Sequence, residues 1–216
     1  MSGVCCHHET QFDGLSADYR RRLWLVIALN AGMFLVEMFG GHVAGSQALK
    51  ADALDFFADA ATYGLSLAVI GMPLRTRANA ALLKGLSLVA MGLWVAGSTL
   101  WQFFVLGVPD APVMGLIGVA ALAANVASVL ILMRYKDGDA NVRSVWLCSR
   151  NDAIGNVAVM AAAGLVWFFA SPWPDLAVAI GMAALFLNSA RQILVQAWRE
   201  RGEQHEHDMP LHAERH

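Results

Sequence analysis

Two acidic residues, Asp55 and Asp59, stand four positions apart in an otherwise apolar stretch. In an α-helix this spacing places both carboxylates on one face, about 6 Å apart along the axis. A charge at the centre of a membrane helix costs roughly 2.5–3.5 kcal/mol, and intramembrane acids usually mark ion or proton pathways. The pair therefore predicts oxygen ligands for one cation. Hydrogen bonding to a neighbouring helix purely for packing is the alternative.

Cys148 and Asp152 form a second pair with the same spacing, and Asn156 continues their face one helical turn further along. One face from each of two helices could close a tetrahedral site of three carboxylates and one thiolate. Four-coordinate sites of this kind suit zinc. Taken alone, Cys148 is also explained as a small buried apolar residue. The acid four residues on favours the ligand role.

Three further polar residues extend this pattern into an auxiliary metal or proton path: Asp52, Asn156 and Glu37. Asp52 either helps an ion to leave or caps its helix near the outer surface. Glu37 either relays protons or forms structural hydrogen bonds. Arg150 either pairs with an acid or extends towards the cytosol, and the sequence leaves its role open.

The first residues form a separate cluster of metal-ligating types, which consists of Cys5, Cys6, His7 and His8 and is followed by Glu9. Three cysteines in the chain are too few for a disulfide scaffold, and nothing near them reads as a signal peptide. We interpret the cluster as a cytosolic arm that captures metal. A polar end of chance composition is the alternative. The histidines near the C-terminus suggest the same role more weakly.

Composition indicates that these residues sit in a membrane. The chain is 57% hydrophobic and 15% charged, whereas soluble domains carry about a quarter charged residues. Nucleic-acid binding finds no support, since no basic face or stripe appears, and the net charge of -2 says little because it averages apolar spans with charged ends. A bilayer core of about 30 Å needs roughly 20 apolar residues per helix. Six stretches qualify, over residues 23–44, 47–72, 81–106, 112–133, 144–170 and 175–197.

Positive charge gives these stretches a direction. Arginine and lysine gather before the first stretch and after the second, fourth and sixth, with Lys50 as the exception. The alternation predicts an all-α membrane protein with six transmembrane helices and both termini in the cytosol. We expect a cytosolic N-terminal tail over residues 1–19, a six-helix transmembrane transport domain over 20–198 and a polar, histidine-containing cytosolic tail over 199–216.

The paired motifs, placed within six helices, resemble the cation diffusion facilitator family. The residues Gly-Ser-Gln-Ala-Leu-Lys-Ala-Asp-Ala-Leu-Asp over 45–55 look like the family's approach to its second helix, and the resemblance covers about residues 20–198. It implies a carrier that exchanges divalent metal, commonly zinc, for protons. It also implies a transport site formed by Asp55, Asp59, Cys148 and Asp152. Further similarities are Asn30, Glu37, Asn125, Asn141, Arg143 and Asp175.

Two departures from the family pattern bear on this expectation. Cys148 stands where the family generally has histidine or aspartate. A thiolate favours zinc or cadmium, whereas three carboxylates lean towards manganese or iron. The family's usual cytosolic C-terminal domain, which binds metal and dimerises, is not found in the 216 residues, so we expect a short form with a homodimer contact through its transmembrane helices.

We therefore predict a carrier, not an enzyme, that exports zinc from the cytosol in exchange for protons, with cadmium, cobalt, iron or manganese as other candidate metals. The metal is the substrate, no cofactor is expected, and the partners are the lipid bilayer, the metal ion and protons. A multi-pass location in a bacterial inner membrane is expected. The alternative is a membrane-bound metal sensor or metal-delivery protein. An intramembrane enzyme is disfavoured, since helices two to six offer no histidine as base.

Overall fold

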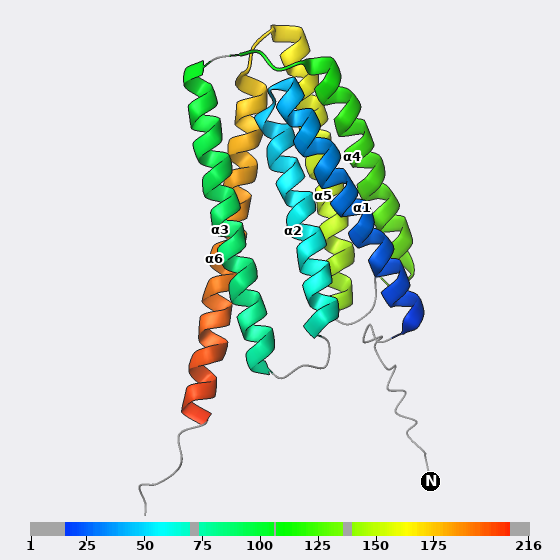
Figure 1. Cartoon of the computed structure of the whole chain (residues 1–216), viewed down its shortest axis with the longest axis vertical. Helices are drawn as coiled ribbons and strands as arrows, with labels where there is room; N and C mark the ends of the chain where they lie inside the picture. Colours follow the sequence, from blue (N-terminus) through cyan, green and yellow to red (C-terminus); the bar gives the residue numbers. More distant parts are fainter. Residues whose placement is uncertain (1–15, 70–73, 106, 136–139, 208–216) are drawn as a thin grey trace, which may run out of the picture.

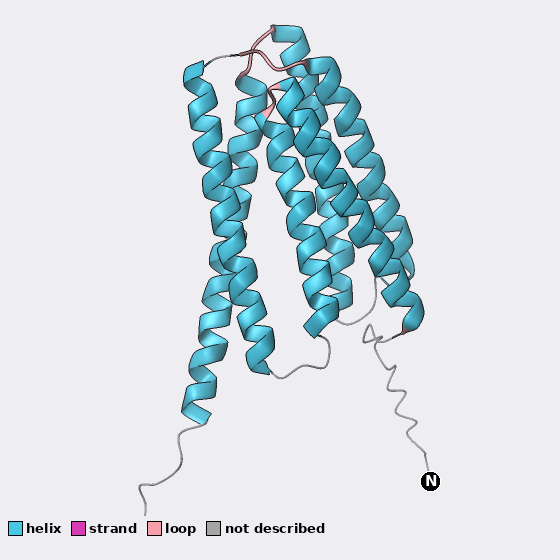
Figure 2. Cartoon of the chain, viewed as in Figure 1, coloured by secondary structure: helices cyan, strands magenta, loops and turns pink. Residues whose placement is uncertain are grey.

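A computed structural model describes residues 16–69, 74–105, 107–135 and 140–207. Within these ranges the chain is helical throughout, without strands, as the fold prediction expected (Figure 2). Successive helices run antiparallel, so both ends of the described chain lie at the same end of the bundle (Figure 1). The elements are α1 (Ala17–Ala44), α2 (Gln47–Val69), α3 (Leu74–Val105), α4 (Ala111–Leu132), the 3-10 turn η1 (Met133–Tyr135), α5 (Ala140–Phe169) and α6 (Trp173–His207).

The helices associate in pairs: α1 along α2, α4 along α5, and α3 along α6. Figure 1 shows α3 and α6 side by side, next to a group formed by α1, α2, α4 and α5. Helix α2 also contacts α3, α5 and α6. Because α2 and α5 carry the predicted metal ligands, this packing brings the two pairs of ligands into one region.

Small residues allow the close approach of α3 and α6. A Cβ atom at Gly92 would lie 2.9 Å from the Leu187 side chain and 3.3 Å from the backbone oxygen of Ala183. Such contacts are typical of membrane helices, which associate through tight packing. Gly45 has a different role, because it ends α1 with a φ of 68°, a conformation that side chains disfavour.

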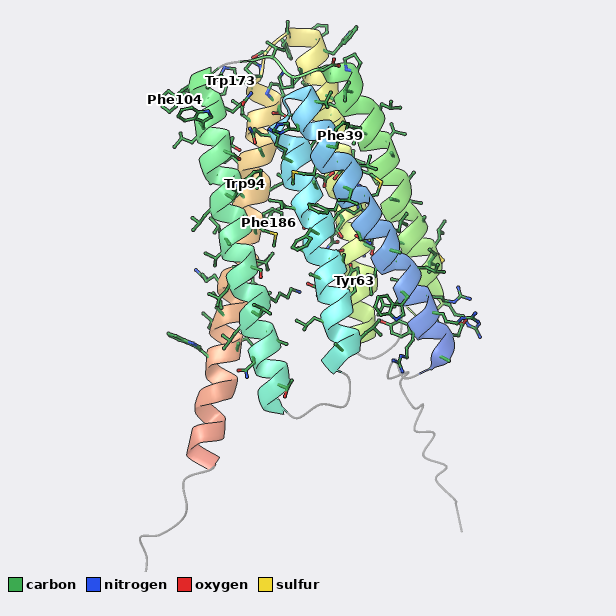
Figure 3. The ribbon with its side chains drawn as sticks, in the orientation of Figure 1. Phe39, Tyr63, Trp94, Phe104, Trp173 and Phe186 are labelled. Atoms are coloured by element: carbon green, nitrogen blue, oxygen red, sulfur yellow. The ribbon has the colours of Figure 1, made fainter. Side chains whose placement is uncertain are left out.

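The distribution of side chains is the reverse of that in a soluble bundle. Large apolar side chains face outward, and Phe39, Leu116 and Phe168 are 74%, 75% and 79% exposed. Trp173 and Phe104 lie at one end of the bundle in Figure 3, where aromatic side chains commonly meet the lipid headgroups. The buried interior contains the polar residues Asn30, Glu37, Ser46, Gln47, Asp52, Asp59, Thr99, Asn125, Ser128, Ser149, Asn156 and Asp175. An apolar exterior around a polar interior suits lipid rather than water.

Within the described residues, five helices are long and apolar enough to cross a membrane: Ala17–Ala44, Asn79–Val105, Ala111–Tyr135, Cys148–Phe169 and Trp173–Trp198. Helix α2 does not qualify by composition, because every stretch of 18 residues within it includes Asp52, Asp55 and Asp59. It nevertheless packs inside the bundle against four other helices. The residues that indicate function are thus the reason why α2 is less apolar than the rest. Its crossing of the membrane stays a prediction.

Helix ends differ from the predicted boundaries outside the apolar stretches. Helix α1 begins at Ala17, because the Ser16 hydroxyl accepts a hydrogen bond from the Tyr19 amide at 3.2 Å and caps the helix. Helix α3 begins at Leu74 rather than at 81, and α6 continues to His207 rather than ending at 197. Helix α6 therefore extends into the segment expected to be a polar tail. Glutamate and arginine are good helix formers in water, so hydropathy does not mark this end.

A buried carboxylate holds the N-terminus of α2 to α6. Asp175 Oδ1 accepts hydrogen bonds from Ser46 Oγ at 2.5 Å and from the Ala48 amide at 3.1 Å, and its Oδ2 accepts from the Gln47 amide at 2.8 Å. Ser98 Oγ of α3 donates to Gln47 Oε1 at 3.1 Å. The first amide groups of a helix lack partners within the helix. Asp175 supplies those partners and joins α2 to the α3–α6 pair.

A second polar contact ties α1 to the end of α4 near the start of the described chain. Arg22 Nε donates to Asp18 Oδ2 at 3.0 Å, and the Tyr135 hydroxyl donates to the same oxygen at 2.5 Å. Arg22 also donates to the Ile131 backbone oxygen at 3.4 Å. Exposed ion pairs contribute little to stability. The contact mainly sets the register of the two helices at the charged end of the bundle.

Candidate metal centre

The predicted ligands of α2 and α5 meet inside the bundle. The carboxyl group of Asp152 lies within hydrogen-bonding reach of both Asp55 and Asp59. Asp59 is buried, and Asp55 and Asp152 are half-buried. Three carboxylates this close repel one another strongly in a medium of low dielectric constant. They therefore need protons or a cation between them, which is the property expected of a cation site.

Tyr63 joins the same cluster from α2. Its hydroxyl group donates a hydrogen bond to Asp59 Oδ2, and its oxygen lies 3.5 Å from Ser149 Oγ of α5. Figure 3 shows Tyr63 in the half of the bundle nearer the chain ends. Sequence reasoning missed Tyr63 and Ser149. The spacing of four residues between Asp59 and Tyr63 was the available signal, since it places both on one face.

Cys148 lies where both of its predicted roles are possible. It is half-buried and packs at the edge of an apolar cluster that includes Tyr19, Leu23 and Tyr63. It also lies close enough to Asp59 for the carboxylate charge to act on the thiol. The position of Cys148 is therefore consistent with both apolar packing and metal ligation.

The carboxyl groups do not form a ready-made coordination sphere. Among the residues that the structure describes, no three histidine, cysteine, aspartate or glutamate side chains are arranged to hold a metal ion as they stand. Carboxyl groups that share protons turn their oxygens towards one another. A tetrahedral site instead needs four ligand atoms aimed at one point about 2.0–2.3 Å away. Rotation of these side chains is required before they can surround an ion.

A second acidic pair lies at the contact between α1 and α2. Glu37 is 0% exposed and Asp52 is 2% exposed, and their carboxyl groups adjoin. Within the described residues, neither oxygen of Glu37 nor Oδ2 of Asp52 has a hydrogen-bond partner at 3.5 Å or less. Because Ser46 and Asp175 bind the first amides of α2, Asp52 is not its cap. The neighbour of Glu37 is another acid, so a hydrogen bond between the two carboxyl groups needs a proton on one of them.

The asparagines named by the sequence occupy different environments. Asn156 is 0% exposed, and in the described part of the chain neither its amide nitrogen nor its oxygen has a partner. Asn125 is also buried, whereas Asn30 donates to the Val26 backbone oxygen at 2.8 Å within its own helix. Arg150 is exposed and donates to Asn151 Oδ1 at 3.3 Å. The side chains of Asn141 and Arg143 lie outside the described ones, as do residues Cys5, Cys6, His7 and His8.

Lys84 of α3 is a neighbour of the site that the sequence did not indicate. It lines a cavity of about 180 Å³ between α2 and α3, together with Ala58, Thr62 and Ser87. Its positive charge acts on Asp55, Asp59 and Cys148. No local pattern predicts this proximity, because it depends on how α3 packs against α2.

Comparison with known proteins identifies the family. Residues 23–200 match the cation efflux transmembrane domain. The chain belongs to the cation efflux family, as the resemblance to cation diffusion facilitators implied. Membership, together with five apolar helices, makes it a multi-pass membrane protein.

Relatives of the chain include three bacterial proteins. Zinc transporter ZitB of Escherichia coli (strain K12) is 29% identical over 194 residues, which cover 83% of this chain and 62% of the relative. The cadmium, cobalt and zinc/H(+)-K(+) antiporter of Bacillus velezensis is 24% identical over 192 residues, with coverages of 81% and 60%. The metal cation efflux system protein CzcD of Cupriavidus metallidurans is 24% identical over 172 residues, with coverages of 74% and 54%.

The matches span less than two thirds of each of these relatives. All three names describe transport or efflux rather than catalysis, which is consistent with a protein that is not an enzyme. The bacterial relatives also agree with a location in a bacterial inner membrane.

Proposed function

We propose that this protein exports divalent transition-metal cations from the cytosol in exchange for protons, with zinc as the first candidate substrate. The observation that carries the proposal is the meeting of Asp152 with Asp55 and Asp59 inside an apolar-faced bundle. The family and the names of the relatives support metal efflux, and zinc is named in two of the three. Cadmium, cobalt, iron and manganese are further candidate substrates.

The proposal places α2 across the bilayer as a sixth span, with both ends of the described chain in the cytosol. Arg20, Arg21 and Arg134 all lie at the end of the bundle where the described chain begins, and positive residues favour the cytosolic side. A homodimer through the transmembrane helices belongs to the proposal by family analogy alone. The N-terminal cluster of cysteines and histidines is proposed to collect metal near the cytosolic mouth.

Transport then follows from the chemistry of the four proposed ligands. A metal ion that arrives from the cytosol binds to Asp55, Asp59, Asp152 and Cys148 in their ionised forms, so binding releases protons. The helices rock and expose the site to the other side, as in other alternating-access carriers. Protons then displace the ion, and the protonated carboxyl groups no longer repel one another during the return. Metal and protons thereby compete for the same oxygens.

Metal flux into proteoliposomes tests the proposal. The wild-type protein is expected to carry zinc when an imposed pH gradient drives protons in the opposite direction. Asp59→Ala is expected to abolish this flux because it removes a ligand and the Tyr63 contact. Asp110→Ala is the control, because Asp110 is an exposed residue that caps α4, and this variant should keep the wild-type zinc flux. Undiminished flux in Asp59→Ala would overturn the assignment of the site. Tight metal binding without flux for any metal would favour a sensor or delivery protein.

Replacement of the thiol tests the role of Cys148. Cys148→Ser is expected to lower cadmium affinity by about tenfold and to leave manganese affinity nearly unchanged, because thiolates prefer soft ions. The measurement is competition between the two metals for purified protein, with Cys148→Ala as a second variant. Equal effects on both metals would show that Cys148 contributes packing rather than ligation.

A further inference from the structure

Glu37 and Asp52 are buried carboxyl groups that the proposed metal site does not use. Both are at least nine-tenths buried, and three of their four oxygens lack a hydrogen-bond partner among the described residues. An ionised carboxylate buried without a partner loses several kcal/mol of solvation. Two such groups side by side also repel each other, as in sites where two acids share one proton. The buried pair therefore requires a bound proton or cation to offset this repulsion.

The charged groups around the pair do not neutralise it. The titratable groups that act on Glu37 are Asp52 and Asp55, both of which are acids and supply no positive charge. Helix α4, which also packs against α1, has no titratable residue between Ala111 and Leu132. His42 on α1 is exposed, and Lys50 on α2 is only half-buried and interacts with Asp175. Titratable groups on the other neighbours of α2 include Lys84 of α3, Cys148, Arg150 and Asp152 of α5, and Asp175 and Arg191 of α6.

The position and size of the pair favour a proton over a metal ion. Asp52 lies about 8 Å from the start of α2, and Glu37 about 10 Å from the end of α1, at 1.5 Å per residue. Asp59 lies about 18 Å from the start of α2 on the same scale. The pair thus lies between the proposed metal ligands and the end of the bundle opposite the chain ends. Zinc sites usually take three or four protein ligands, whereas two adjoining carboxyl groups are sufficient to share a proton.

Asn156 extends this region on α5. It stands one turn from Asp152 towards the same end of the bundle, and it is fully buried with no partner for its amide in the described ranges. An amide both donates and accepts hydrogen bonds. It can therefore bond to a carboxyl group in either protonation state.

We propose that Glu37 and Asp52 form a proton-binding site, separate from the metal ligands, that receives a proton from the outer side and passes it to the carboxyl cluster of α2 and α5 as metal leaves. The proton moves from water to a carboxylate oxygen of the pair and then to a carboxylate oxygen of the cluster, with no change in oxidation state. This inference rests on the proposed metal–proton exchange. It assigns the proton's path to α1, which contributes no proposed metal ligand.

Glu37→Gln in the full chain tests the inference, because glutamine keeps the size of the side chain and removes the acid. Flux of zinc driven by a pH gradient is expected to fall at least about tenfold, because the variant lacks the acid that would carry the proton. Zinc binding and zinc–zinc exchange at equal pH on both sides are expected to remain. Asp52→Asn is the second variant and should behave alike. Thr99→Val is the control, since it removes a buried hydroxyl without a partner in the described residues from α3, a helix that contributes no residue to the pair.

Three outcomes would overturn the inference. Gradient-driven flux could remain at the wild-type level in both folded variants. The number of zinc ions bound per chain could fall in Glu37→Gln, which would make the pair a metal site. Infrared spectra at neutral pH could show the same protonated-carboxyl band in the wild-type protein and in the Glu37→Gln, Asp52→Asn double variant. The infrared arm does not need transport, so absence of flux in the wild-type protein would count only against the proposed function.

Discussion

Asp152→Asn is expected to lower zinc affinity by about 100-fold or more. Asp152 is the carboxyl group within reach of both Asp55 and Asp59, so it joins the ligands of α2 to those of α5. Asparagine has nearly the same shape but no charge. Loss of a residue that only orients a ligand typically costs 10–100-fold in metal affinity, and loss of a ligand costs more.

Isothermal titration of zinc into purified protein measures this effect. Asp110→Asn is the matched control, because Asp110 is an exposed aspartate at the start of α4 and should keep the wild-type affinity. Both variants should elute as folded, monodisperse protein. If Asp152→Asn binds zinc as tightly as the wild-type protein does, α5 does not contribute this ligand, and the site must be sought elsewhere on α2.

Asp175→Ala is expected to destabilise the bundle by several kcal/mol. The substitution leaves the buried Ser46 hydroxyl and the amides of Gln47 and Ala48 without their acceptor. Each buried donor left unpaired costs about 1–3 kcal/mol, so the three together give a loss of at least about 3 kcal/mol. It also releases the N-terminus of α2 from α6, which should loosen the end of the helix that holds Asp52 and Asp55.

Reversible unfolding in detergent compares Asp175→Ala with Asp110→Ala. Asp110 Oδ1 accepts one hydrogen bond from the Val113 amide at 3.1 Å and is exposed, so its loss should cost about 1 kcal/mol, as for other helix caps. Asp175→Asn keeps one acceptor oxygen and should fall between the two. Equal stability of the two alanine variants would show that the buried contacts of Asp175 contribute little.

The spacing of residues along the sequence was sufficient to assign the candidate metal ligands to individual helix faces. Asp55 and Asp59 share a face of α2, and Cys148 and Asp152 share a face of α5, because the helical period determines which side chains point the same way. Apolar stretches of membrane length likewise indicated where helices lie, since lipid demands a continuous apolar surface. The predicted start of α1 and the predicted end of α6 were wrong, because both helices continue beyond the apolar stretches, where hydropathy does not indicate a helix.

The resemblance implied that the faces of the two ligand pairs meet, and only the tertiary structure decided what else packs around them. The sequence by itself determined an all-helical membrane protein and the two candidate ligand pairs. It could not show that Asp175 caps α2, that Glu37 adjoins Asp52, or that Lys84 lies beside the acids. Each of these contacts joins helices that are distant along the chain, and helical periodicity carries no information about the partner of a face. Packing between helices supplies that information, and with it the separation of a proposed proton site from the proposed metal site.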